Sequence, residues 1–233
     1  MPARTHPSAV VGPGVELGDD VVVGPFAVLL GPCRVEAGAW LGPHVTLGVP
    51  PEIRGHAHPA AWDGELTGAG VVIGARTVLR EFTTVHQGSA RPTTIGADCF
   101  IMNKVYVAHD SVVGDRVTMA STVTMGGHVR VGAGANLGLG AVVHQRRVIG
   151  AGAMVGMGAV VSRDLPPFAM AYGNPARVRG ANRVGMSREG LSDDVVALVH
   201  ERYAGPDGDP GEAASLPEPL RSAVLAWRSE SGA

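Results

Sequence analysis

The chain has 233 residues, of which 19 are basic and 21 acidic, so its formal net charge is −2. This length allows one sizeable core, or one core with a small appendage. The near-neutral charge argues against nucleic acid or an anionic membrane as the main partner. With 34 glycines and 45% hydrophobic residues, the chain is neither an ordinary helical domain nor a disordered polymer.

The N-terminal segment, MPARTHPSAVVGPGVELG, contains no apolar run long enough for a signal peptide. No stretch of the chain approaches the ~20 apolar residues that a membrane helix needs. The two cysteines, Cys33 and Cys99, are far apart and lack metal-ligand spacing, which is typical of buried thiols in a reducing compartment. We therefore expect a cytoplasmic protein that does not insert into membranes.

Aliphatic residues recur every six positions over most of the chain. They occur at positions 11 to 47, 73 to 85 and 95 to 161, which gives 22 units, and glycine follows the leading residue in 13 of them. Neither a helix nor an amphipathic strand has this period. A short strand plus a tight turn does, and three such units close a triangular coil in which the first and fifth side chains share one interior. We predict an all-β fold, a parallel β-helix over residues 1–165.

Two interruptions of the period are expected to be loops that leave the coil. The first covers residues 49–72, and the second adds four residues near positions 90–93. Residues 166–233 are expected to form a C-terminal region that starts with a loop, AYGNPARVRGANRVG. A helix should then begin at Ser192, with Asp193 and Asp194 in its first turn. The linker PDGDPGEAAS should lead to a last short helix over 216–228, so that this α-helical tail packs on the end of the β-helix.

Four units share one face of the predicted prism, because units 18 residues apart are stacked. These units read VHQGSA, VAHDSV, MGGHVR and VHQRRV, and they contain His86, His109, His128 and His144. Solvent-exposed histidines and a metal site are the alternatives to a catalytic role, since imidazole suits zinc. Hexapeptide-repeat carbonic anhydrases hold zinc with histidines that include a pair five residues apart, whereas the closest pair here is sixteen apart. We therefore expect no metal.

The VAHDSV unit offers a candidate general base. An imidazole with an ordinary pKa of about 6.5 is suited to this task at physiological pH. A neighbouring carboxylate can hold its tautomer and stabilise the imidazolium that forms. His109, helped by Asp110, would therefore deprotonate a hydroxyl or amine that attacks a thioester. The Gly126-Gly127 pair leaves the backbone open, as an oxyanion site requires.

The repeat resembles that of the hexapeptide-repeat acyltransferases, which implies left-handed coils and a homotrimer. The segments IMNKVYVAHDSVVGDRV, TMGGHVRV, AVVHQRRVIGAGAMVG and DLPPFAMAYGN are more specifically similar to the UDP-N-acetylglucosamine O-acyltransferases of lipid A biosynthesis, over roughly residues 6–204. The resemblance implies that His109 is the base, that Asp110 assists it, and that Gly127 supplies an oxyanion N–H. It also implies that acyl carrier protein brings the acyl group on its phosphopantetheine, with no other cofactor.

The same resemblance implies further site residues. Those expected to bind the sugar-nucleotide acceptor and the phosphopantetheine arm are His86, His128, His144, Gln145, Asn182 and Arg183. Met157 would end the groove for the acyl chain and favour a short or medium acyl group. Tyr106 stands where the family has a histidine, and Ala61 stands where it has a lysine that contacts phosphate. The segment that contacts the nucleotide in the family is shortened here to GANRVG, so the identity of the acceptor stays open.

Three other functions are compatible with the repeat. They are an acetyl-CoA-dependent sugar acetyltransferase, favoured by GNPAR at 173–177, a non-catalytic β-helical scaffold, and a zinc hydratase. Arg147 occupies an inward fifth position, where an unpaired guanidinium is too costly to bury. Either the turn is remodelled so that Arg146 and Arg147 face the cleft, or the register slips there.

Overall fold

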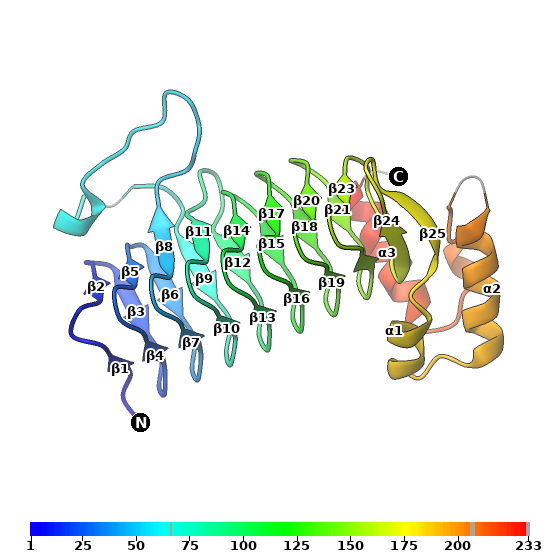
Figure 1. Cartoon of the computed structure of the whole chain (residues 1–233), viewed down its shortest axis with the longest axis horizontal. Coiled ribbons are helices and arrows are strands. Elements are labelled where there is room, and N and C mark those ends of the chain that lie inside the picture. The colour runs from blue at the N-terminus through cyan, green and yellow to red at the C-terminus, as the bar shows by residue number, and fades with distance from the viewer. Residues whose placement is uncertain (66, 206–207, 232–233) are drawn as a thin grey trace.

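The computed structural model describes residues 1–65, 67–205 and 208–231 of the chain. Leu66 of the expected loop, Pro206 and Asp207 of the expected linker, and Gly232 and Ala233 of the tail lie outside the described residues. Within the described part, the chain winds into a long parallel β-helix, with helices gathered at its C-terminal end (Figure 1). The parallel β-helix expected from the six-residue period is confirmed.

Three sheets form the sides of the coil, and every strand pair in them is parallel except β24 with β25. Sheet A contains β1 (Arg4–Thr5), β4 (Val22–Val23), β7 (Trp40–Leu41), β10 (Val78–Leu79), β13 (Phe100–Ile101), β16 (Thr118–Met119), β19 (Asn136–Leu137), β22 (Met154–Val155), β24 (Ala169–Tyr172) and the antiparallel β25 (Arg177–Ala181). Sheet B contains β2 (Val10–Val11), β5 (Val28–Leu29), β8 (Thr46–Val49), β11 (Thr84–His86), β14 (Tyr106–Val107), β17 (Thr124–Met125), β20 (Val142–Val143) and β23 (Val160–Val161). Sheet C contains β3 (Val15–Leu17), β6 (Cys33–Val35), β9 (Val71–Ile73), β12 (Thr93–Ile95), β15 (Val112–Val113), β18 (Arg130–Val131) and β21 (Val148–Ile149).

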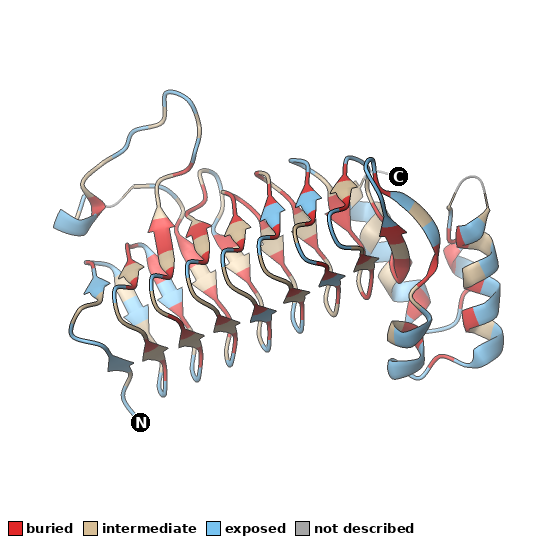
Figure 2. Cartoon of the chain, in the orientation of Figure 1, coloured by how far each residue is buried: buried red, intermediate tan, exposed pale blue. Residues whose placement is uncertain are grey.

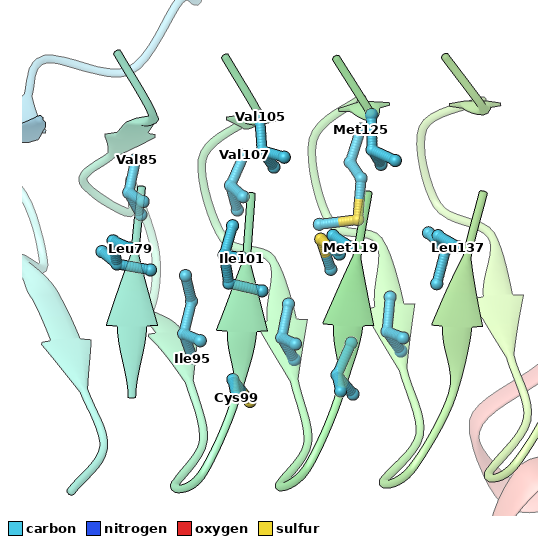
Figure 3. Packing of buried hydrophobic residues seen from close by; sticks show 14 of the residues in the cluster. Leu79, Val85, Ile95, Cys99, Ile101, Val105, Val107, Met119, Met125 and Leu137 are labelled. Carbon is cyan, nitrogen blue, oxygen red and sulfur yellow. The ribbon is translucent and has the colours of Figure 1, made fainter. Parts of the chain in front are cut away.

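The core is a continuous aliphatic column along the axis of the coil. Leading residues such as Leu79, Val107 and Leu137 are fully buried and stack from one coil to the next (Figure 3). The register explains this stacking, because each strand pairs with the strand 18 or so residues away at the same place in its unit, as Val107 does with Met125. In most two-residue strands a buried second residue thus follows a more accessible first one, as in β14 (Figure 2). At the N-terminal end, where no further coil covers it, the leading residue Val11 is 40% exposed.

Both cysteines are free and buried in this column. Burial raises the pKa of the Cys33 thiol to about 12. It also raises the pKa of Cys99, although hydrogen bonds to the thiol oppose the shift. Neither cysteine is therefore a ready nucleophile.

The two interruptions do leave the coil. The segment between β8 and β9 projects far from the prism and carries the short 3-10 helix η1 (Ala61–Asp63), as Figure 1 shows. The second interruption lies between β11 and β12 and folds back on the corner where sheet B leads into sheet C. Both loops therefore border the end of the sheet B strands.

The C-terminal region differs in part from the expectation. The stretch expected to be a loop forms the β24–β25 hairpin and the helix α1 (Arg183–Arg188), because β24 pairs with β22 and continues sheet A. The helix expected at Ser192 is α2 (Asp193–Ala204), and it packs on β25. After η2 (Ala213–Ser215), the last helix α3 (Leu220–Ser231) packs on β21 of sheet C. Among the described residues, none of these helices has the length and apolarity needed to cross a membrane.

Candidate active site

The expected histidines lie along one corner of the prism, where sheet B strands end and sheet C strands begin. We call this the B–C corner and define it by three stacked turns, 109–110, 127–128 and 145–146. Backbone hydrogen bonds join the turns, from His128 N–H to the His109 carbonyl and from Arg146 N–H to the Gly127 carbonyl. Asp110, His128 and Arg146 each occupy the left-handed region, with φ of 59°, 61° and 61°. The repeat therefore presents equivalent turn positions one above the other.

Asp110 is fully buried at this corner, and its carboxylate accepts more hydrogen bonds than any other side chain there. Its Oδ1 accepts hydrogen bonds from the backbone N–H groups of Ser89, Ala90 and Arg91 at 3.0, 2.8 and 3.0 Å. Its Oδ2 accepts one from the Ser89 hydroxyl at 2.7 Å. The loop at residues 89–91, where the insertion lies, thus surrounds the carboxylate with hydrogen-bond donors. Burial alone would raise the pKa of Asp110, but hydrogen bonds from His109, Ala90, Ser89 and Arg91 outweigh it and lower that pKa well below its usual value.

The ionised Asp110 fixes the orientation of His109. His109 Nδ1 lies 2.6 Å from Asp110 Oδ2, and since the carboxylate only accepts, Nδ1 is the donor. This leaves Nε2 with its lone pair available. An ideal Cβ at Gly127 would lie 2.6 Å from that Nε2, so only glycine fits opposite the ring. Among the described residues, no acceptor for the Gly127 N–H is found.

His128 completes the corner beside His109. The two rings meet edge to face, with centroids 5.0 Å apart, and His128 Nε2 lies 3.9 Å from Asp110 Oδ2. Burial lowers the pKa of His128; Asp110 opposes this, while the nearby charges of Arg146, His109 and Arg91 lower it further. His128 is therefore suited to hydrogen bonding in its neutral form.

His109, Asp110 and His128 also form the one group in the described residues whose donor atoms lie close enough to hold a metal ion. However, the Asp110 oxygens already accept four hydrogen bonds from the 89–91 loop and one from His109. A metal would have to displace these donors. The geometry therefore fits a hydrogen-bonded pair better than a zinc site, for which three or four free ligands are needed.

His86 and His144 lie at the same edge of sheet B but have different surroundings. His86 Nδ1 lies 2.8 Å from the Pro50 carbonyl and its Nε2 lies 3.1 Å from Glu52, both in the extruded loop. The centroid of its ring also lies 5.4 Å from that of Tyr106, the residue that stands where the family has a second histidine. His86 therefore holds the loop in place. His144 is exposed, and its Nδ1 lies 3.1 Å from the carbonyl of Gln145, which is exposed too.

The remaining expected residues lie elsewhere on the prism. Asn182 caps α1: its side chain accepts from Gly185 N–H at 3.1 Å and donates to the Gly152 carbonyl at 2.9 Å. It lines a groove of about 470 Å³ between α1 and sheet A, together with Arg116 and Arg188. Arg183 is exposed and does not line this groove. Sequence reasoning missed Arg188, and its spacing of six from Asn182 gives no signal, because neighbours on one helix face are three or four residues apart.

Met157 lies in the turn between β22 and β23 and is 74% exposed. This turn is at the corner where sheet A leads into sheet B, whereas His109 is at the far end of the sheet B strands. One chain therefore does not bring Met157 next to His109.

Arg147 does not point into the core. Its guanidinium lies 3.4 Å from Asp164 at the B–C corner, and the neighbouring Val148 is buried on β21, on which α3 packs. The Asp164 carboxylate also accepts a hydrogen bond from Val148 N–H at 2.8 Å. Neither alternative for this turn holds: Arg146 keeps the φ of the turns stacked below it, and Val148 and Ile149 keep their register with Arg130 and Val131. Arg147 instead pairs with Asp164 at the corner from a regular turn.

Family models and individual relatives both indicate the same family for this chain. Residues 164–204 match the family described as UDP-N-acetylglucosamine O-acyltransferase, domain 2, and residues 92–127 match the bacterial transferase hexapeptide repeat. A relative from Paraburkholderia xenovorans (strain LB400), named an acyl-(acyl-carrier-protein)–UDP-N-acetylglucosamine O-acyltransferase, is 36% identical over 216 residues, which cover 86% of this chain and 82% of the relative. A relative of the same name from Thermodesulfovibrio yellowstonii is 34% identical over 219 residues and covers 85% of this chain and 82% of its own length.

A solved structure agrees with this assignment. The UDP-N-acetylglucosamine acyltransferase from Campylobacter jejuni superposes with a TM-score of 0.79 at 26% identity, covering 98% of this chain and 97% of its own. The match extends over the coil and the helical tail, and it confirms a left-handed parallel β-helix with a small C-terminal helical region. The chain belongs to the UDP-N-acetylglucosamine O-acyltransferase family.

Proposed function

We propose that this chain transfers an acyl group from acyl carrier protein to a hydroxyl of UDP-N-acetylglucosamine, with His109 as the general base. The relatives carry these substrates in their names. The observation that carries the mechanism is the 2.6 Å bond from His109 Nδ1 to Asp110, which leaves Nε2 free beside Gly127. The two free cysteines fit a reducing compartment, so we place the reaction in the cytoplasm.

The steps follow from this geometry. His109 Nε2 takes the proton of the acceptor hydroxyl as its oxygen attacks the thioester carbonyl. Asp110 stabilises the imidazolium that forms. The Gly127 N–H donates to the oxyanion of the tetrahedral intermediate. When the intermediate collapses, the carbon–sulfur bond breaks and the proton on His109 passes to the departing phosphopantetheine thiolate.

The acceptor and donor need more surface than one corner supplies. Asn182 and Arg188 line their groove on sheet A, whereas His109 and His128 lie at the B–C corner. We propose that a homotrimer brings the groove of one subunit to the B–C corner of the next, with Arg188 and Arg116 facing the nucleotide. His144 and Gln145, which are exposed at the corner, would contact the pantetheine arm. The only prosthetic group that this reaction needs then arrives on the donor.

The test is mass spectrometry of products after incubation with acyl-acyl carrier protein, acyl-CoA and a panel of sugar nucleotides. His109→Ala should lower turnover by about 10²–10⁴-fold, the usual loss of a general base, while the fold is kept. His58→Ala, an exposed histidine of the extruded loop, is the matched control and should leave turnover unchanged. Near-normal turnover in His109→Ala would place the base elsewhere, and transfer from acyl-CoA alone would favour the acetyltransferase alternative.

A further inference from the structure

A basic cleft opens beside the B–C corner, between sheet C and the end of α3. It has a volume of about 440 Å³, and Asp110 and His128 of the active site line one side of it. Three arginines from different parts of the chain also line it: Arg91, Arg130 and Arg146. Its walls include Val148 and one carboxylate from the tail, that of Glu230.

The three guanidiniums are held to different degrees. Arg91 is fixed in place, because its Nε and Nη2 donate to the Asp110 carbonyl at 3.0 and 2.9 Å. Arg130 Nη1 lies 3.4 Å from Glu230. The guanidinium of Arg146 has no hydrogen bond or ion pair with any residue that the structure describes.

The sheet around Arg130 offers it no other carboxylate. On sheet C, Arg130 pairs in register with Val112 on one side and Val148 on the other, so its strand neighbours are apolar. Three guanidiniums line this cleft against two carboxylates, those of Asp110 and Glu230, so the cleft has an excess of positive charge that a bound anion would neutralise. Guanidinium groups are the preferred partners of phosphate, because their N–H groups bind two oxygens at once.

We propose that this arginine cleft binds a phosphate ester of a substrate while its reactive group is at His109. The inference rests on the proposed function, since the cleft shares Asp110 and His128 with that site. Two substrates carry the chemistry: the acyl donor, through the phosphodiester of its phosphopantetheine, and the acceptor, through its diphosphate. Glu230 occupies Arg130 in the absence of that phosphate and gives way when it binds.

The test uses charge-neutralising variants, Arg130→Gln and Arg146→Gln. The matched control is Arg34→Gln, an arginine that faces outward from β6 of the same sheet, four strands or about 19 Å from β18. The donor arm compares kcat/KM for an S-acyl pantetheine and for the S-acyl 4′-phosphopantetheine with the same acyl group, which differ only in the phosphate. The acceptor arm measures UDP binding by calorimetry on a His109→Ala background, which needs no turnover.

We expect each variant to lower one of the two measured quantities about tenfold: either the kcat/KM preference for the phosphorylated donor or the affinity for UDP. This is the usual effect of losing one charged hydrogen bond. Loss of the preference for the phosphorylated donor assigns the cleft to the donor, and weaker UDP binding assigns it to the acceptor. If both arms stay within twofold of the control, the cleft binds no substrate phosphate and the inference is wrong. That result would leave the His109 mechanism standing, because the Ala variant at that position tests it separately.

Glu230→Gln supplies a second, opposite readout. Freeing Arg130 should raise the same quantity, the donor preference or the UDP affinity, by up to about fivefold, the usual limit for a partly exposed ion pair. If the ion pair has only a structural role, Glu230→Gln and Arg130→Gln should instead change this quantity in the same direction. Such parallel losses would also overturn the inference.

Discussion

Gly127→Ala tests whether the space opposite His109 matters for catalysis. The added Cβ would lie 2.6 Å from His109 Nε2 and 2.7 Å from its Cε1. An ordinary contact between such atoms is about 3.5 Å, so the ring must retreat by about 0.9 Å. A misplacement of about 1 Å lowers turnover by roughly 10²-fold. The φ of Gly127 is not in the left-handed region, so the backbone itself accepts alanine.

The assay is steady-state turnover of Gly127→Ala in the wild-type and the His109→Ala backgrounds. We expect the roughly 10²-fold loss only when the imidazole is present, because without the ring the methyl group has nothing to displace. Thermal unfolding of each variant checks that the coil is intact. Wild-type turnover in Gly127→Ala would refute the contact, and an equal further loss in the His109→Ala background would mean that the methyl group blocks something other than the base.

Three further predictions concern Asp110, a bound metal and Met157. Asp110→Asn should lower turnover less than His109→Ala does. Because hydrogen bonds lower the pKa of Asp110 in the fold, its carboxylate stabilises the protein above about pH 4, and this contribution is lost as the pH falls below that value. The difference in urea midpoint between wild type and Asp110→Asn should therefore shrink below about pH 4, and a constant difference down to low pH would contradict this. Strong chelators should leave turnover unchanged; loss of activity that zinc restores would instead show that the His109–Asp110–His128 group is a metal site. Met157→Gly should shift the preferred donor toward longer chains, by about fourfold for each methylene newly buried at about 0.8 kcal/mol, as measured by competition between acyl donors; an unchanged preference would remove Met157 from the acyl groove.

Some of the fold follows directly from the printed sequence. The six-residue spacing of aliphatic residues determines that Leu79, Val107 and Leu137 line one interior, and they are fully buried. The period is local, since each unit repeats the same strand and turn, so it could be counted without any long-range contact. The same count placed His109 and His128 on one face of the prism, one coil apart, and in the structure their rings meet at its corner.

The C-terminal stretch 171–185 could not be predicted in the same way. It has no six-residue repeat, so a loop was expected there. Only the pairing of β24 with β22, along the open edge of sheet A, makes it a hairpin. A strand of this kind is decided by the edge that is available to it, which a single sequence does not show.

The site shows the same division between local pattern and tertiary contact. The sequence by itself determined that a histidine and an aspartate stand together at a turn of the coil. Only the tertiary structure decided that the 89–91 loop donates four hydrogen bonds to Asp110, and that His86 is held by Glu52 of the extruded loop. The physical reason is that both loops lie outside the repeat. Their side chains and backbone N–H groups find partners by folding back across the corner, and no spacing along the chain encodes that contact.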